Sequence, residues 1–581
     1  MLLLLAAALG ANFALAVPAS PPLAVSAGTA DMSEAWAAWE AGDHAQAVAL
    51  AAPLAAGGNG EALYLLAAAH HFGTGADSDL EEAARLYRRA ADAGYAAAFA
   101  PLGLMHEAGL GVAKDVAKAN ALYLEGANKG DQTAVYYLAN NMYHGLGAAP
   151  DHETAVRLMR AAAAGGHARS MHLLGVALDE GKGIKENDKD ALAWFRRCAE
   201  LGETDCERSV GIMHEYGRGV PLDLAAAFRS YAKAAAAENP GAYVDVGMAH
   251  HYGRGIAKDP AEAMRWYVKG FEEGQAGGAY GIAQLHHDGL GVARNLDEAL
   301  SWYEKAAALD HAPALVSAGI FHRDGVGTAV DAQKAVAYFR RAAEAGEGDG
   351  MVELADAYRT GTGVAKHWPT ARGWLDKAAA LGNAGAMVEL GWVHETGGGP
   401  GVDHKAALAW YRKAAAAGDG VGMTNLALMH ANGRGTRVDH KAAFRFFSQA
   451  AAAGDARGTM FLGLAYADGQ GVAKNPKKGF ELVAKAAALD NAEAIAELGV
   501  LYETGVGTTK DEAEAVRLYR KAADMGAPTG MRYLGINLAT GIGVAVDKKE
   551  GAAWLRKAVK AGDPEAAKVL LGVIFAREDE K

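Results

Sequence analysis

The chain has 581 residues, of which 51% are hydrophobic, which is enough to bury an extended core and excludes a largely disordered protein. Its formal charge of −12 and the lack of any basic run of five residues exclude the electrostatic attraction that dominates nucleic-acid binding. Two cysteines are too few for a disulfide-rich scaffold or a zinc centre held by cysteines.

The first residues have the pattern of an export segment. Residues 2–17 form an apolar run that is shorter than the roughly 20 residues of a membrane span but has the length of a signal-peptide core. Cleavage after Ala19, Ala27 or Ala30 would each fit, and Ala30 is favoured because helical patterning begins at Asp31. We therefore expect residues 1–30 to direct export to the periplasm or the extracellular space, with an uncleaved anchor as the alternative. The mature chain is expected to have no membrane span.

A repeat of 36 residues organises the rest of the chain. Residues 31–60 are expected to form an N-terminal capping helical hairpin, fourteen copies fill residues 61–564, and residues 565–581 are expected to form a C-terminal capping helix. Every copy contains a Gly-x-Gly pair. The first glycines of these pairs are Gly73, Gly109, Gly145, Gly181, Gly217, Gly253, Gly289, Gly325, Gly361, Gly397, Gly433, Gly469, Gly505 and Gly541.

The columns of the repeat predict two helices per copy. Four residues after the second glycine stands Asp or Asn, with His367 as the exception, which predicts a helix N-cap. The helix that follows ends at a glycine in eleven copies, and Glu238, Asp310 and Asp490 stand at this left-handed position in the others. Six residues before each first glycine is Gly or Ala, which predicts close approach between helices.

We therefore expect an all-α solenoid in which each copy contributes helix A, the Gly-x-Gly turn and helix B. If each helix forms its own layer of about 9 Å, equivalent residues in neighbouring copies lie roughly 18 to 20 Å apart.

Copies such as residues 496–507 (Ala-Glu-Leu-Gly-Val-Leu-Tyr-Glu-Thr-Gly-Val-Gly) resemble the Sel1-like repeat family, a relative of the tetratricopeptide repeats. The resemblance covers 504 of the 581 residues. It implies a right-handed superhelix whose concave side is lined by helix A, and a non-enzymatic scaffold or adaptor that binds a protein or peptide and needs no cofactor. It also leaves open an adaptor for protein degradation in the endoplasmic-reticulum lumen, which the lack of a glycosylation acceptor and of a retention tail weighs against.

Eight copies carry histidine in helix A where the family usually has tyrosine. These residues are His70, His106, His214, His250, His286, His322, His394 and His430. A ladder of metal sites would need ligands within about 2.1 Å of one ion, far less than the expected spacing. We therefore expect no metal and predict that each histidine packs on the turn and bonds to a backbone group. If the histidines are neutral and partly buried, protonation below about pH 6 would weaken the fold.

Cys198 and Cys206 occupy columns that are mostly alanine, so both are expected in a tight helical contact. The pair resembles the cysteine-rich branch of the family, in which cysteines eight residues apart clamp adjacent helices, although here both stand one place earlier in the repeat. The resemblance implies a disulfide in an oxidising compartment. Two reduced, buried small residues are the alternative.

Recognised catalytic motifs are missing, and the Gly-x-Gly turns follow no strand, so we expect no enzyme and no catalytic residue. Ser230 and Lys233 match the Ser-x-x-Lys of penicillin-recognising enzymes, and β-lactam binding is attached to some cysteine-rich relatives. The alternative is therefore an exported cell-wall or β-lactam hydrolase. Its companion motifs are lacking, and Ser230 falls in an aromatic core column.

Positions that break the repeat pattern on helix A are where a partner is expected. The residue after the mid-helix Gly or Ala is usually apolar, but four copies carry a polar residue or tryptophan there, and two of these have aromatic residues on the same helical face. Such side chains anchor peptides well, while local packing variation is the alternative. The predicted contact residues are Tyr136, Asn140, Tyr143, Tyr280, Gln284, His287, Asp356 and Trp392.

Overall fold

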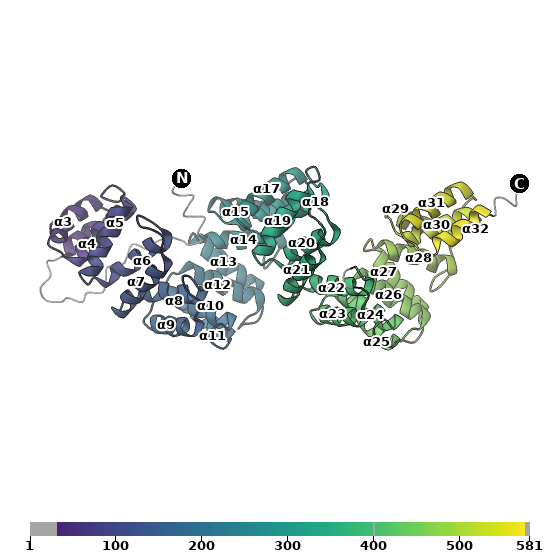
Figure 1. Ribbon diagram of the computed structural model, residues 1–581, viewed down its shortest axis with the longest axis horizontal. Coiled ribbons are helices and arrows are strands. Elements are labelled where there is room, and N and C mark those ends of the chain that lie inside the picture. The colour runs from purple at the N-terminus through teal and green to yellow at the C-terminus, as the bar shows by residue number, and fades with distance from the viewer. Residues whose placement is uncertain (1–31, 399–400, 576–581) are drawn as a thin grey trace. The chain divides into compact units, whose positions relative to one another are not determined.

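A computed structural model of the protein describes residues 32–398 and 401–575 (Figure 1). Within these residues the secondary structure consists of 31 α-helices and one short 3-10 helix, without strands. The chain divides between Leu309 and Asp310 into two compact units, which we call the first and second units. The expected export segment, residues 1–30, lies outside the described residues.

The helices of the first unit are α2 (Ser33–Glu40), α3 (His44–Ala56), α4 (Gly60–Phe72), α5 (Leu80–Asp92), η1 (Ala96–Ala98), α6 (Phe99–Ala108), α7 (Val116–Asn128), α8 (Gln132–His144), α9 (His152–Ala164), α10 (Ala168–Glu180), α11 (Asp188–Glu200), α12 (Thr204–Tyr216), α13 (Leu224–Ala236), α14 (Pro240–Tyr252), α15 (Pro260–Glu272), α16 (Ala276–Asp288) and α17 (Leu296–Ala308). The helices of the second unit are α18 (Ala312–Asp324), α19 (Ala332–Glu344), α20 (Gly348–Thr360), α21 (Trp368–Ala380), α22 (Ala384–Thr396), α23 (His404–Ala416), α24 (Gly420–Asn432), α25 (His440–Ala452), α26 (Ala456–Asp468), α27 (Pro476–Ala487), α28 (Ala492–Thr504), α29 (Glu512–Asp524), α30 (Pro528–Thr540), α31 (Lys548–Lys560) and α32 (Ala566–Phe575).

The predicted all-α solenoid of helix-turn-helix repeats is confirmed. Even-numbered helices from α4 to α30 are the helices A of the fourteen repeats and odd-numbered helices from α5 to α31 are the helices B, with η1 beginning the second helix A. Within each unit, every helix packs against the next one along the chain, and helices A of neighbouring repeats also touch, as α14 and α16 do. Each unit is therefore built from contacts between near neighbours in sequence.

The predicted N-caps are present at the start of all fourteen helices B. Asp115 Oδ1, for example, accepts a hydrogen bond of 2.9 Å from the backbone N–H of Lys118. The exception in sequence, His367, has the same role, because its Nδ1 lies 3.3 Å from the backbone nitrogen of Thr370. Each helix B thus begins where a side chain satisfies a free backbone N–H of the first turn.

The two glycines of each turn have different tasks. The first ends helix A in the left-handed conformation, as at Gly73 with φ +66°. The second packs on the backbone of the preceding repeat: a Cβ on Gly255 would lie 2.1 Å from the carbonyl oxygen of Leu224. The mid-helix column is equally close-packed, because a Cβ on Gly247 would lie 2.6 Å from the ring of Tyr267, which confirms the expected close approach.

The ends of the helices B also agree with the prediction. Gly94 has φ +87°, and the three non-glycine residues at the same column have positive φ as well: Glu238 at +60°, Asp310 at +55° and Asp490 at +53°. No other non-glycine residue in the described part of the chain has a positive φ. A left-handed residue is therefore required there whatever the side chain.

The helix A histidines follow the prediction only in part. His70 Nδ1 lies 3.0 Å from the carbonyl oxygen of Asp77, and His106 Nδ1 lies 3.4 Å from that of Ala113. The Nδ1 atoms of His214 and His430, however, are buried without a hydrogen-bond partner. Burial lowers the pKa of His106, His214 and His430, which favours the neutral ring in the folded state.

At the N-terminal end of the first unit, α3 stands where a helix B would, because a Cβ on Gly75 would lie 2.4 Å from the carbonyl oxygen of His44, as in the repeats. At the other end of the chain, α32 packs on α31 and leaves Leu571 54% exposed.

No helix in residues 32–398 and 401–575 has the length and apolar character needed to cross a bilayer.

Candidate functional site

Side chains on helices A of neighbouring repeats are in direct contact, so the expected spacing of roughly 18 to 20 Å is wrong. The Tyr252 hydroxyl of α14 donates a hydrogen bond of 3.2 Å to Gln284 Oε1 of α16, and Arg208 of α12 pairs with Asp245 of α14. Helices A and B lie in separate layers, so one repeat advances the stack by about one helix diameter instead of two. Each unit therefore presents a continuous row of helices A.

In the first unit this row carries what we call the α12–α16 face, formed by Tyr216, Arg218, Tyr252, Arg254 and Gln284. Tyr216 ends α12 and is 63% exposed, and Tyr252 ends α14 and is 45% exposed. A guanidinium lies over each ring: Arg218 Cζ is 5.8 Å and Arg254 Cζ is 5.1 Å from the respective ring centroid. Two exposed aromatic residues thus stand one repeat apart, each beside a cation.

The two arginines are held by carboxylates of the preceding repeat. Arg218 Nη1 lies 2.8 Å from Asp179 Oδ2, and Arg254 Nη1 lies 2.7 Å from Glu215 Oε1. Glu215 also accepts a hydrogen bond of 2.6 Å from the hydroxyl of the buried Tyr231, which holds the carboxylate in place from the side of the core. The guanidinium groups are therefore positioned before any partner arrives.

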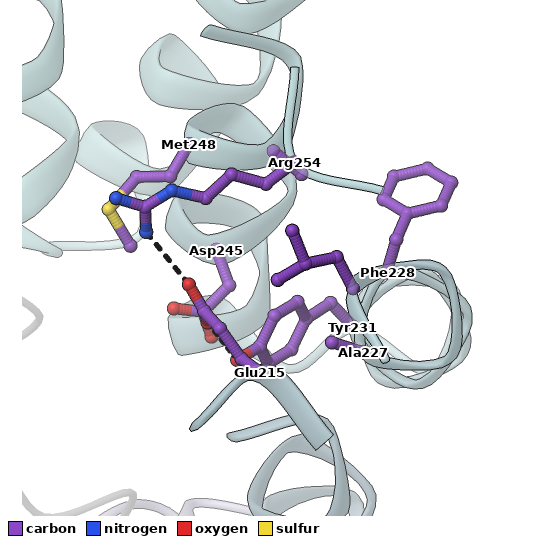
Figure 2. A pocket seen from close by; sticks show the side chains of 9 residues that line it. Glu215, Ala227, Phe228, Tyr231, Asp245, Met248 and Arg254 are labelled. Carbon is purple, nitrogen blue, oxygen red and sulfur yellow. Dashed lines mark hydrogen bonds and ion pairs between the residues drawn. The ribbon is translucent and has the colours of Figure 1, made fainter. Parts of the chain in front are cut away.

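A shallow recess lies beside Arg254 (Figure 2). Phe228, Met248 and the ring of Tyr231 line it, and Glu215 and Asp245 supply its carboxylates. Burial raises the pKa of Asp245, although Arg208 opposes the shift. The same recess recurs in the second unit on equivalent repeat positions, lined by residues that include Phe339, Glu353, Asp356 and Thr362.

The structure places the predicted contact residues in three groups, on α8, on α16, and on α20 with α22. Tyr136 and Asn140 on α8 are half-buried. Tyr143 is only 3% exposed and donates a hydrogen bond of 2.8 Å to Glu180, so its expected role at the surface is wrong. Its ring packs on His152 of α9, in the same repeat, and its hydroxyl reaches α10 of the next repeat.

On α16, Gln284 accepts the hydrogen bond from Tyr252 and thereby joins the α12–α16 face. Tyr280 packs its ring 5.6 Å from that of Tyr303, and His287 is partly exposed. In the second unit, Arg359 connects the remaining two residues, because it pairs with Asp356 and lies 4.9 Å from the ring centroid of Trp392, which is 40% exposed.

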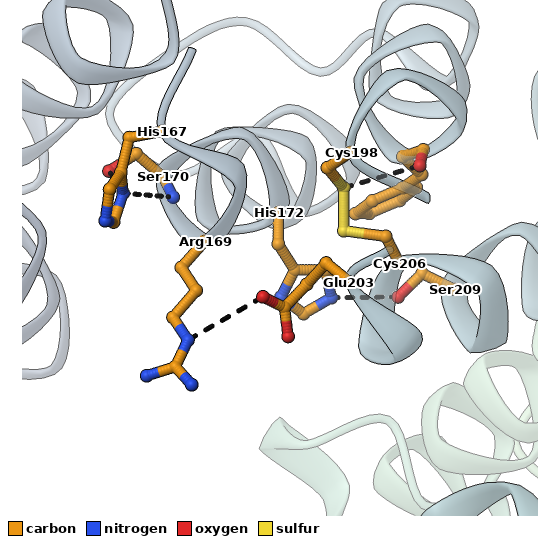
Figure 3. Close-up of a disulfide and its surroundings, with 9 residues drawn as sticks. His167, Arg169, Ser170, His172, Cys198, Glu203, Cys206 and Ser209 are labelled. Carbon is orange, nitrogen blue, oxygen red and sulfur yellow. Dashed lines mark hydrogen bonds and ion pairs between the residues drawn. A yellow bond between two sulfur atoms is a disulfide. The ribbon is translucent and has the colours of Figure 1, made fainter. Parts of the chain in front are cut away.

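The two cysteines are joined between α11 and α12 (Figure 3). Their Cα atoms are 5.9 Å apart and both side chains are fully buried, so the bond ties helix B of one repeat to helix A of the next. His172 Nε2 lies nearby, 2.9 Å from Ser209 Oγ. His172 and Ser209 lie inside α10 and α12, where the backbone N–H groups are used by helical hydrogen bonds.

Ser230, the residue of the Ser-x-x-Lys match, lies on α13 and is 9% exposed. Within the described residues, no group of three or more His, Cys, Asp or Glu side chains could hold a metal ion. What the surface does offer is a set of preformed aromatic and charged side chains on the helices A, which suits binding.

The sequence matches the Sel1 repeat in fourteen consecutive segments. The matched residues are 60–95, 102–131, 133–167, 168–203, 204–239, 240–275, 276–311, 312–347, 348–383, 384–419, 420–455, 456–491, 492–526 and 528–563. The chain belongs to the Sel1 repeat family.

Solved structures of several proteins, among them proteins with Sel1 repeats, are similar to this chain. One is c5321, a protective antigen present in uropathogenic Escherichia coli strains, with 24% identity, a TM-score of 0.41, and coverage of 78% of this chain and 97% of that one. A Sel1 repeat protein from Oxalobacter formigenes has 30% identity, a TM-score of 0.38, and coverage of 42% and 98%. Yeast Tom70 has 13% identity, a TM-score of 0.32, and coverage of 84% and 96%. The curated proteins contain no match to the sequence.

Sequence reasoning missed the most exposed residues of the α12–α16 face. A signal for them exists: the residue before the first glycine of the Sel1 repeat is Phe, Tyr or Trp in only three copies, as Phe72, Tyr216 and Tyr252. The residue after that glycine is arginine in Arg218, Arg254 and Arg434 only. The coincidence of both features in two consecutive repeats would have located the face.

Proposed function

We propose that this chain is a non-enzymatic scaffold that binds a partner protein or peptide on the helix A rows of its Sel1 repeats. The α12–α16 face carries the proposal, because Tyr216 and Tyr252 are exposed one repeat apart and each lies beside an arginine already held by a carboxylate. Tyrosine and arginine contribute most of the binding energy at many interfaces. Groups positioned in advance lose less entropy when a partner binds.

The proposal includes export to the periplasm or the extracellular space. The apolar run at residues 2–17 supports it. The pairing of Cys198 with Cys206 supports it as well, since structural disulfides persist mainly in oxidising compartments.

The test is photo-cross-linking in the native host, with the cross-linking residue placed at position 216 of the full chain. We expect a defined protein adduct that disappears when Tyr252 is replaced by alanine. The matched control places the cross-linker at Leu201, which is 57% exposed at the turn between α11 and α12. The same adduct from position 201, or its survival in Tyr252→Ala, would overturn the assignment of this face.

A further inference from the structure

The last residues of three consecutive helices A form a line along the first unit. Tyr216 ends α12, Tyr252 ends α14 and Asp288 ends α16. The two tyrosines are 63% and 45% exposed, and the side chain of Asp288 is 53% exposed. We call these three residues the Tyr-Tyr-Asp line. It extends the α12–α16 face, because Asp288 occupies the position of Tyr252 in the next repeat.

The spacing along this line is set by the distance between neighbouring helices A. Arg208 of α12 pairs with Asp245 of α14. Tyr252 of α14 bonds to Gln284 of α16. Helices in such direct contact lie about 8–10 Å apart. A bound segment that contacts every residue of the line must therefore present side chains to the same side at about that interval.

Among regular backbone conformations, polyproline II matches this spacing. It has three residues per turn and rises about 3.1 Å per residue, so every third side chain returns to the same side after about 9.3 Å. A β-strand returns after two residues, which span only about 6.7 Å. An α-helix also comes close, because seven residues span about 10.5 Å, and the hydrogen-bonding groups of the face have to distinguish the two.

Hydrogen-bond donors predominate on the α12–α16 face. Arg218 and Arg254 each bring five N–H donors and use part of them on a carboxylate of the preceding repeat. Gln284 accepts from Tyr252 through Oε1, and its amide nitrogen adds two further donors. The complementary segment has free carbonyl oxygens and few N–H groups. Polyproline II meets both conditions, since it has no internal hydrogen bonds and proline lacks the N–H, whereas an α-helix uses its carbonyl oxygens internally.

Asp288 places a negative charge at one end of the line. Its described ion-pair partner is the adjacent His287, whose Nδ1 lies 3.8 Å from Asp288 Oδ1 and which is charged only when protonated. The carboxylate also acts on the preceding repeat, because burial raises the pKa of Tyr252 and Asp288 adds to that shift. A positively charged residue of the bound segment is therefore favoured at this end of the line.

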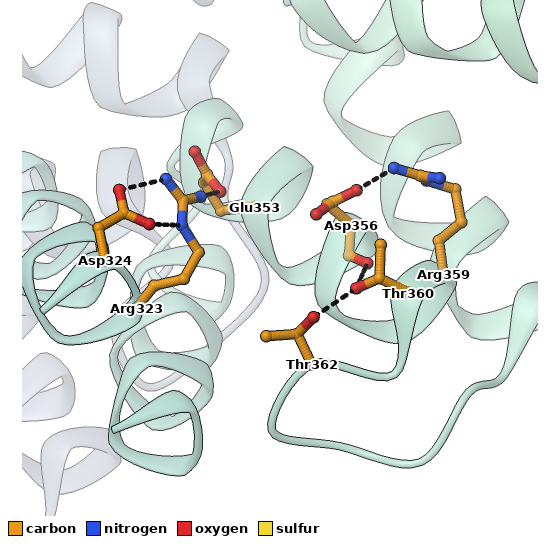
Figure 4. Close-up of polar contacts among 7 residues, drawn as sticks. All are labelled: Arg323, Asp324, Glu353, Asp356, Arg359, Thr360 and Thr362. Atoms are coloured by element: carbon orange, nitrogen blue, oxygen red, sulfur yellow. Dashed lines mark hydrogen bonds and ion pairs between the residues drawn. The ribbon is translucent and has the colours of Figure 1, made fainter. Parts of the chain in front are cut away.

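Figure 4 shows the same repeat positions in the second unit. Asp324 and Thr360 stand where the first unit has its two exposed tyrosines. Asp324 pairs with Arg323 at 2.7 Å. The hydroxyl of Thr360 lies 2.8 Å from that of Thr362, which replaces Arg254. At these positions the side chains bond to one another and bring no aromatic ring, so the Tyr-Tyr-Asp line is particular to α12, α14 and α16.

We propose that the α12–α16 face, extended by Asp288, binds a proline-rich segment of a partner protein in the polyproline II conformation. Two prolines three residues apart pack against Tyr216 and Tyr252, and a lysine or arginine three residues further along pairs with Asp288. The two arginines and the amide of Gln284 donate hydrogen bonds to carbonyl oxygens of the segment. This inference rests on the proposed scaffold function and names the class of segment that the scaffold binds.

The test is binding of synthetic oligoproline peptides of about ten residues to the full chain, measured by isothermal titration calorimetry. One peptide carries a lysine near its N-terminus and a second carries it near its C-terminus, because the segment can lie along the face in either direction. We expect at least one of the two to bind, and a peptide of equal length made of glycine, serine and one lysine not to bind. Absence of binding by both oligoprolines would overturn the inference.

Variants of the two tyrosines locate the site. Tyr216→Ala and Tyr252→Ala are each expected to weaken oligoproline binding about tenfold or more. Both positions are exposed, so both variants are expected to fold, which circular dichroism checks. Phe72→Ala is the matched control, because Phe72 ends α4 at the same repeat position and is 42% exposed, but is followed by Thr74 where the line has arginine. An equal loss of binding in Phe72→Ala would contradict the assignment to the Tyr-Tyr-Asp line.

Reversal of the charge at the end of the line tests the third contact. Asp288→Lys is expected to weaken binding of the lysine peptide about threefold or more and to make a peptide with glutamate in place of lysine the better ligand. Asp468→Lys is the control, because Asp468 ends α26 at the same repeat position and is exposed. An unchanged preference for lysine in Asp288→Lys would overturn the pairing with Asp288.

The outcomes separate this inference from the scaffold proposal. Oligoproline binding that is lost in Tyr216→Ala and Tyr252→Ala, but kept in Phe72→Ala, supports the inference. Oligoproline binding that neither tyrosine variant weakens overturns it. Absence of oligoproline binding, together with a protein adduct cross-linked from position 216, overturns the inference and leaves the scaffold proposal standing. Absence of both overturns both.

Discussion

The two recesses are built on the same backbone and differ in their charged side chains. In the first unit, Tyr231, Glu215 and Arg254 form a continuous hydrogen-bonded set. In the second unit, the equivalent positions are Phe339, Arg323 and Thr362, and carboxylates come from α20 instead. The comparison shows that glycine and aromatic columns keep the repeat geometry constant, while a few helix A and turn positions change the charged side chains that line each recess.

The largest expected effect concerns the backbone that both recesses share. Alanine at Gly255 or Gly363 would place a Cβ 2.1 Å from a carbonyl oxygen of the preceding repeat and would require a left-handed φ. We expect each change to cost about 3 kcal/mol or more of local stability, measured by hydrogen exchange of the adjoining helices. Gly346→Ala is the control, because Gly346 also has a left-handed φ of +89° but a Cβ added there would have no atom within 4 Å. An equal loss of stability in Gly346→Ala would show that the contact between repeats is not the cause.

A second difference is the covalent bond of the first unit. For a loop closed over a sequence separation of 8 residues, the bond between Cys198 and Cys206 is expected to add about 2.5 kcal/mol to the free energy of unfolding. The double replacement by alanine, the usual residue of these columns, should therefore increase hydrogen exchange in α11 and α12 and leave the second unit unchanged. Thiol titration of the unreduced protein should find no free cysteine, and two free thiols would contradict the prediction.

Acid should weaken the first unit through His167, which caps α10. Burial lowers its pKa to about 4, well below the ordinary value of about 6.5, so the unfolded chain binds the proton more tightly than the folded one. Stability is therefore full above about pH 6.5 and falls as the pH drops toward 4. We expect a loss of about 1–2 kcal/mol between pH 7 and pH 5, measured by urea unfolding, which His167→Asn removes because asparagine keeps the cap. If the stability of His167→Asn depended on pH as that of the unchanged protein does, His167 would not be the source of the acid sensitivity.

Arg254→Thr should make the first recess resemble the second. It leaves Glu215, whose side chain is 12% exposed, with the Tyr231 hydroxyl as its remaining described partner. Because Arg254 itself is 44% exposed, we expect a modest cost of about 1 kcal/mol that shrinks in high salt. Arg434→Thr tests the same arrangement in the second unit, where Arg434, Glu395 and Tyr411 repeat it, and the two costs should agree.

The smallest effect concerns the helix B ends that lack glycine. Glu238→Gly in the first unit should raise stability by about 0.5–1 kcal/mol, because glycine adopts φ +60° without steric cost. Asp310→Gly in the second unit should gain less, since it removes the ion pair of 2.6 Å with Arg341. Thermal unfolding of both variants measures which one gains more stability. A larger gain for Asp310→Gly than for Glu238→Gly would show that the ion pair with Arg341 does not stabilise the fold.

Much of the fold could be predicted because its signals are local. An Asp or Asn before helix B and a glycine after helix A report on hydrogen bonds within one turn of chain, so the N-cap at Asp115 and the left-handed residues at Glu238, Asp310 and Asp490 follow from the sequence. The candidate surface could be predicted only in part. The repeat pattern indicated Asp356 and Trp392, which the structure places on either side of Arg359, and their role in binding stays a prediction. Tyr143 was expected at the surface, but its ring is buried and packs on His152 of the same repeat.

The sequence by itself determined the length of the repeat, the number of copies, the position of each helix and the residues that break the pattern. Only the tertiary structure decided that helices A touch one another, that Arg254 reaches Glu215 of the preceding repeat, and that Tyr216 and Tyr252 stay exposed. The physical reason is the sequence distance over which each interaction acts. Helix caps and left-handed glycines depend on backbone groups a few residues away, whereas side-chain exposure and ion pairing depend on how one repeat packs on the next.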